Sequence, residues 1–92
     1  MGHTHFGYRI ENGKAVTDES AAAQVRDLYK HYLSGLSLTN AAKEAGLDLL
    51  HAGAKRMMLN RHYLGDDFYP AIIDPASFDA VSAELTLSLI HI

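Results

Sequence analysis

The sequence predicts a mainly α-helical domain with a small β component (α+β): an N-terminal β-hairpin, a long helix, a helix-turn-helix, a short β segment and a C-terminal helix. Three observations predict this class. An Asn-Gly pair at 12–13 separates two short runs of β-type residues, which is a strong local signal for a hairpin. Apolar residues recur with a helical period from 19 to 34. Residues 37–60 contain two short helical patterns with a glycine between them, the outline of a helix-turn-helix.

The hairpin is expected over residues 6–17. With a two-residue loop at 12–13, Glu11 pairs with Lys14, and the opposite charges of this pair are favourable. The alternation predicts that three apolar side chains share the face that covers the helices: Tyr8, Ile10 and Ala15.

The long helix is expected from Glu19 to Ser34. Thr17 or Asp18 can cap its N-terminus, and Gly35 ends it where a left-handed residue is favoured. Apolar residues at helical spacing form the stripe that faces the core: Ala21, Ala22, Val25, Leu28, Tyr29, Tyr32 and Leu33.

The helix-turn-helix is expected to begin with a helix at 38–45, which Ser37 caps and Gly46 ends. A short loop then leads to a second helix, from 48 or 49 to 59. Its apolar side is expected to carry Leu50, Ala54, Met57 and Met58. The opposite side carries Ala52, Lys55, Arg56 and Leu59, with His51 at the border.

Residues 63–73 are expected to be extended, with one or two short strands, because aromatic and β-branched residues are frequent there. Pro70 limits such a strand to a sheet edge, and Asp66-Asp67 is interpreted as a turn. Asp74 then caps a last helix that starts at Pro75. Its apolar face is expected to carry Phe78, Ala80, Val81 and Leu85. The apolar tail at 86–92 either extends this helix or forms an edge strand.

The composition limits the class of protein. The 92 residues suit a single domain, with an expected core at 6–84 and tails at 1–5 and 86–92. The absence of cysteine excludes disulfides and thiolate zinc sites and fits a cytoplasmic location. No apolar run approaches the roughly 20 residues that span a bilayer, so no membrane contact is expected. The six histidines show no pair at i, i+4 spacing, so neither a metal site nor a cofactor is expected.

The basic residues near the second motif helix favour a nucleic-acid partner. Lys55, Arg56 and Arg61 lie in a ten-residue window without an acidic residue, although the chain has a net charge of −3. Because DNA-binding affinity comes largely from phosphate neutralisation, an acidic chain binds DNA only if its acidic residues lie away from this window.

Several short motifs follow one another in a fixed order: Phe6-Gly7-Tyr8, Val25-Arg26 with Tyr29 and Tyr32, Gly35-Leu36-Ser37-Leu38 with Ala41-Ala42, Arg56-Met57-Met58 with Asn60, Tyr63-Leu64-Gly65, and Pro70-Ala71-Ile72-Ile73-Asp74 with Phe78 and Val81. In this order they resemble the recombinase domain of the large serine recombinases, the resolvase- and invertase-related integrases. The resemblance covers about residues 6–84. It implies a DNA-binding domain that follows a serine-nucleophile catalytic domain and reads part of an attachment site.

The chain departs from that family in three respects. It lacks the catalytic serine domain, so no enzyme activity and no catalytic residue are expected. It has no cysteine, so the family's zinc ribbon is absent. Residues 52–54 are Ala-Gly-Ala where Ser-Thr-Val is usual, which removes hydroxyls that could reach phosphate.

The resemblance and the charge pattern together predict a double-stranded DNA site, with the second motif helix in the major groove. The residues expected to read bases are His51, Ala52, Lys55 and Arg56, and those expected to hold phosphates are Ser37, Thr39, Lys43 and Arg61. His62 is a further possible phosphate or base contact. A serine recombinase catalytic subunit or a second copy of the chain is a further expected partner. The alternative is a protein-interaction or dimerisation module derived from the same domain, with weak or no DNA binding.

Overall fold

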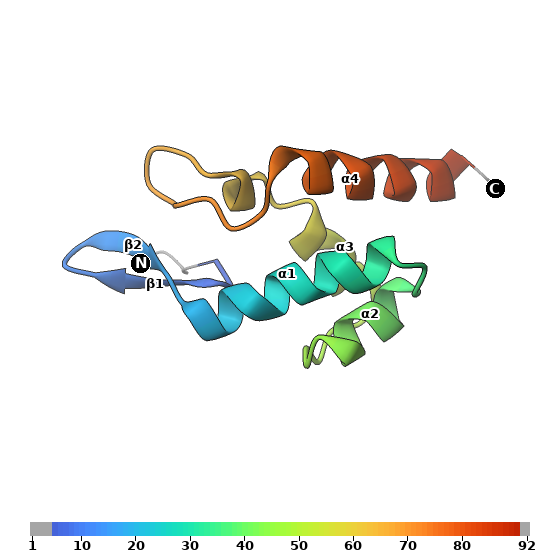
Figure 1. The fold of residues 1–92 in the computed structure, drawn as a ribbon, viewed down its shortest axis with the longest axis horizontal. Helices are drawn as coiled ribbons and strands as arrows, with labels where there is room; N and C mark the ends of the chain where they lie inside the picture. The colour runs from blue at the N-terminus through green and yellow to red at the C-terminus, as the bar shows by residue number, and fades with distance from the viewer. Residues whose placement is uncertain (1–4, 91–92) are drawn as a thin grey trace.

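The hairpin and the four α-helices follow one another in the expected order, and the α+β class is confirmed. The computed structural model describes residues 5–90, with their side chains as far as residue 85. Its elements are β1 (Tyr8–Glu11), β2 (Lys14–Thr17), α1 (Glu19–Leu33), α2 (Leu38–Glu44), α3 (His51–Met58), the 3₁₀ helix η1 (Arg61–Leu64) and α4 (Pro75–Ile90). Figure 1 shows α1 between α2 and α4, with α4 running alongside α1 in the same direction.

The hairpin has the predicted register, in which Glu11 faces Lys14 across the turn. Tyr8 and Ala15 are buried as expected, but Ile10 is 48% exposed. The prediction for Ile10 was therefore wrong. Figure 1 shows why: the turn of the hairpin reaches out beyond the start of α1, so no helix covers its tip.

α1 supplies the centre of the core. Asp18 caps it, with its carboxylate accepting a hydrogen bond from the amide of Ala21. Its fully covered side chains are Ala22, Val25, Leu28 and Tyr29. The predicted stripe does not extend to its C-terminal end, where Leu33 is 41% exposed and lines two open hollows.

The two helices of the predicted helix-turn-helix both form. Ser37 caps α2, and its hydroxyl oxygen accepts a hydrogen bond from the amide of Asn40. The connection to α3 spans residues 45–50, and α3 begins at His51, later than predicted. Leu50 therefore lies before the helix, and the helical periodicity that assigned it to the apolar side does not apply to it. It is 82% exposed, not part of the apolar side as expected.

The predicted short β segment does not form. Within residues 5–90 the sheet consists of β1 and β2 alone, and residues 65–74 form an irregular loop after η1. Most amides of this loop donate to nearby acceptors and are not available to a strand ladder. The carbonyl of Tyr63 accepts from both Ile72 and Ile73, and the carboxylate of Asp66 accepts from the amides of Phe68 and Tyr69. The interpretation of Asp66-Asp67 as a turn agrees with these bonds.

α4 begins as predicted, because Asp74 accepts hydrogen bonds from both the amide and the hydroxyl of Ser77. The helix continues through residue 90, so most of the apolar tail extends it. Its core face carries Phe78, Val81 and Leu85, whereas Ala80 is exposed and was wrongly placed on that face. No helix within residues 5–90 combines the length and apolar character that crossing a membrane requires.

One hydrophobic cluster joins the hairpin, all four helices and η1. Its largest fully buried side chains are Tyr63, Leu28, Met58, Val25 and Val81. Because α3 and η1 each contribute one of these side chains, the segment that carries the predicted DNA contacts is packed against the core.

Candidate nucleic-acid interface

α3 has one side in the core and one side in solvent. Ala54 and Met58 are fully buried, and Met57 packs against the core at its edge. His51, Ala52 and Arg56 are exposed, and Lys55 is half-buried. The predicted division between an apolar and an outward side is thus found from residue 51 onward.

Hydrogen bonds between distant segments position the end of α3 and the start of η1. The hydroxyl of Tyr29 on α1 donates to the carbonyl of Met58. The hydroxyl of Tyr8 on β1 donates to the carbonyls of His62 and Pro70, at 2.9 and 2.6 Å. The hydroxyl of Tyr63 donates to the carbonyl of Phe6 at 2.8 Å. Three buried tyrosines therefore attach the hairpin and α1 to the basic segment.

The predicted phosphate contacts on α2 are accessible. Ser37, Thr39 and Lys43 are all exposed. The hydroxyl oxygen of Ser37 already accepts the capping bond from Asn40. Its proton alone is left to donate to a phosphate, so capping is the main role that the geometry gives this side chain.

Arg56 and Arg61 meet at an open hollow beside α3. The hollow has a volume of about 690 Å³ and is lined by His5, Phe6, Leu49, Gly53, Arg56, Met57, Leu59, Asn60, Arg61, His62 and Tyr63. Lys55 is outside this lining. The guanidinium of Arg61 also lies 5.7 Å from the ring centroid of Phe78 on α4, a distance typical of a cation–π contact.

Aromatic and imidazole rings are packed at the edge of the hollow. The rings of His5 and His62 lie 4.4 Å apart between centroids, and both contact Tyr69. The Nδ1 atom of His62 donates to a carboxylate oxygen of Asp66 at 2.6 Å. The side-chain amide of Asn60 is 3.2 Å from Nδ1 of His5. Sequence reasoning missed His5 and Asn60, because no spacing pattern relates residues so far apart in the chain.

These contacts shift two pKa values. Burial lowers the pKa of His5, the neighbouring His62 lowers it further, and the negative charge of Asp66 partly opposes both effects. The amide of Tyr69, the side chain of His62 and the amide of Phe68 lower the pKa of the Asp66 carboxyl to about 2. Asp66 is therefore ionised at neutral pH and its oxygens are occupied by hydrogen bonds within the loop.

The basic residues of α3 and η1 have no carboxylate partner in the part of the chain that the structure describes. The ion pairs found there within 4.0 Å are Arg9–Glu11, Arg26–Glu19 and His62–Asp66. No group of three or more His, Asp or Glu side chains between residues 5 and 85 is arranged to hold a metal ion.

Comparisons of the chain with protein-family models, with curated proteins and with solved structures find no significant match. The resemblance to the recombinase domain of large serine recombinases therefore stays a prediction from the sequence.

Proposed function

We propose that this protein is a cytoplasmic, non-catalytic DNA-binding domain of the serine recombinase type, which places α3 in the major groove of double-stranded DNA. The observation that carries the proposal is that Lys55, Arg56 and Arg61, on the consecutive elements α3 and η1, have no carboxylate partner within the described residues. In a chain of net charge −3, this segment is the place where phosphate oxygens meet least repulsion.

The dimensions of an α-helix are compatible with this docking. A helix with its side chains is about 10–12 Å across, and the major groove is about 12 Å wide. The outward side of α3 presents one small side chain, Ala52, between His51 and the basic pair Lys55 and Arg56. A small residue at that point lets the helix backbone come close to the base edges.

The test is a fluorescence-anisotropy titration with a mixed-sequence DNA duplex at several salt concentrations. Replacing Lys55 and Arg56 together with Ala should lower the slope of log K against log salt by about two units. The matched control replaces Arg9 and Lys14, two cations on the hairpin, and should leave the slope unchanged. Equal slopes for the wild type and the Lys55/Arg56 variant would refute the docking.

A protein-interaction or dimerisation module is the second proposed function, and one observation favours it. Leu50 directly precedes α3 and is 82% exposed, so its apolar side chain is accessible to a protein partner. If this function is the correct one, Leu50→Ser will abolish self-association in light scattering, and the wild type will bind the duplex no better than the Lys55/Arg56 variant.

A further inference from the structure

We propose that the hollow beside α3 binds a single phosphodiester group of the DNA strand, held between the guanidinium groups of Arg56 and Arg61. This inference rests on the proposed function and adds to it: Arg56 contacts the backbone of one strand instead of a base edge, and the N-terminal segment at His5 becomes part of the site.

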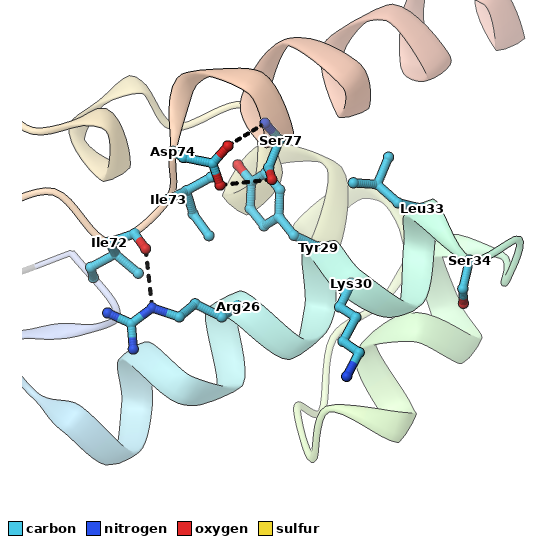
Figure 2. A pocket seen from close by; sticks show the side chains of 9 residues that line it. All are labelled: Arg26, Tyr29, Lys30, Leu33, Ser34, Ile72, Ile73, Asp74 and Ser77. Carbon is cyan, nitrogen blue, oxygen red and sulfur yellow. Dashed lines mark hydrogen bonds between the residues drawn. The ribbon is translucent and has the colours of Figure 1, made fainter.

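The charge of the lining distinguishes this hollow from two others on the described surface. Its lining includes two arginines and two histidines and no acidic residue. The hollow between α1 and α4 contains Asp74 in its lining (Figure 2). A smaller one near the end of α1 contains Glu84. Since a carboxylate in the wall repels an anion, the hollow beside α3 is the one of the three that suits a phosphate.

Arg26, one of the two cations that line the hollow between α1 and α4, is also bound to other groups. In Figure 2, the side chain of Arg26 reaches the carbonyl of Ile72, to which its Nε donates at 3.1 Å, and Lys30 points away from Asp74. A guanidinium of Arg26 also lies 4.0 Å from Glu19. By contrast, neither Arg56 nor Arg61 has a hydrogen bond or ion pair to another described side chain, and Arg61 has only the cation–π contact with Phe78. The N–H groups of both guanidinium groups therefore have no acceptor among the described side chains.

The chemistry of the lining fits a phosphodiester better than a free ion. The planar fork of a guanidinium donates two parallel hydrogen bonds to phosphate oxygens. Phe6 and Leu59 are each 39% exposed and line the same hollow, so they offer apolar contact to the sugars on either side of the phosphate.

His62 supplies a further donor when it is protonated. Its Nδ1 is occupied by Asp66, which leaves Nε2 as the ring nitrogen that can contact a ligand. The charged and titratable groups around this ring are Asp66 and Tyr69 from the loop, His5 from the N-terminal segment, and Arg56 and Arg61 across the hollow.

The probe is the dinucleotide dTpdT, which has one phosphodiester, compared with its methylphosphonate analogue, which has the same shape and no charge. NMR titration of the full chain should show shift changes at Arg56, Asn60, Arg61 and His62 with dTpdT, and binding about tenfold weaker with the neutral analogue. Changes of equal size with both probes, or changes centred on Lys14, Lys30 or Lys43, would overturn the proposal.

Two variants separate the effect of the bidentate guanidinium geometry from the effect of positive charge alone. Arg56→Gln should weaken dTpdT binding by about tenfold, and Arg61→Lys, which keeps the cation over Phe78, should weaken it by less. Arg9→Gln removes a cation from the exposed hairpin and should have no effect. If Arg56→Gln and Arg61→Lys both bind dTpdT as the wild type does, the two guanidinium groups do not form the site.

The same titrations distinguish the two proposals. If the protein binds the DNA duplex with a salt-dependent affinity but does not respond to dTpdT, the proposed function stands and this phosphodiester site is absent. A chain that binds dTpdT through Arg56 and Arg61 but does not bind the duplex has the phosphodiester site, and the proposed docking of α3 is then wrong.

Discussion

The hydroxyl of Tyr29, in the middle of α1, donates a hydrogen bond to the carbonyl oxygen of Met58, in the last turn of α3. The last carbonyls of a helix have no partner within that helix, and this one is buried. The bond therefore provides a donor to a carbonyl that would otherwise be buried without one, at a cost in stability. It also holds the end of α3 that carries Arg56 against the core.

Tyr29→Phe removes this hydrogen bond and leaves the carbonyl of Met58 buried without a donor. We expect the free energy of unfolding to fall by about 1–3 kcal/mol, measured by urea denaturation. Tyr32→Phe is the matched control on the same helix, since Tyr32 is half-buried and its hydroxyl has no hydrogen bond among the described residues. Equal losses in the two variants would contradict the role assigned to the bond.

High pH should unfold the protein through its buried tyrosines. Burial is the largest cause that raises the pKa of Tyr8, to about 12, with the charge of Asp66 contributing. Burial likewise raises the pKa of Tyr29 and Tyr63. Because the folded pKa exceeds the unfolded value of about 10, this stability is present below pH 10 and is lost as the pH rises toward 12. Tyrosinate absorbance and helical circular dichroism should change together. Ionisation of all five tyrosines in a protein that keeps its circular dichroism would contradict this expectation.

Mild acid should weaken the attachment of the N-terminal segment. The pKa of His5 is lowered in the folded state, so the unfolded state binds more protons. The associated stability is present above pH 6.5 and falls as the pH drops through that value. NMR titration should show the His5 ring leaving His62 and Tyr69 in this range. His5→Gln should make the stability of the protein less dependent on pH between 7 and 5. An unchanged dependence would assign the effect to another histidine.

Gly65, in the loop that replaces the predicted strands, is expected to tolerate substitution less well than Gly35 after α1. Its φ is +92°, and an added Cβ would lie 3.1–3.3 Å from the backbone and Cβ of Ala71. Gly65→Ala should therefore combine backbone strain with a clash and cost more than the ~1 kcal/mol typical of strain alone. Gly35→Ala is the control, because Gly35 has a φ of +115° and open space around it. The melting temperatures of the two variants are compared by thermal unfolding. A smaller decrease for Gly65→Ala than for Gly35→Ala would mean that the loop rearranges to accommodate the added Cβ, and would contradict this expectation.

Two errors of sequence reasoning concern the backbone around α3 and after η1. The composition of residues 63–73 favours strands, but the carbonyl of Tyr63 and the carboxylate of Asp66 bind several amides within the same segment, and this selects a loop. Leu50 was assigned to the apolar side of the second motif helix, yet α3 begins at the following residue, so the helical period does not apply to Leu50.

The sequence was sufficient for the hairpin turn and for the caps of three helices, features that depend on near neighbours in the chain. The Asn-Gly turn specifies the hairpin register, and Asp18, Ser37 and Asp74 mark where helices begin, because a turn or a cap involves residues no more than three or four positions apart. The hollow beside α3 could not be predicted in this way. It exists because the core brings His5 within ring contact of His62 and places Arg56 near Arg61, and only the packing of the whole chain relates side chains that are more than fifty residues apart.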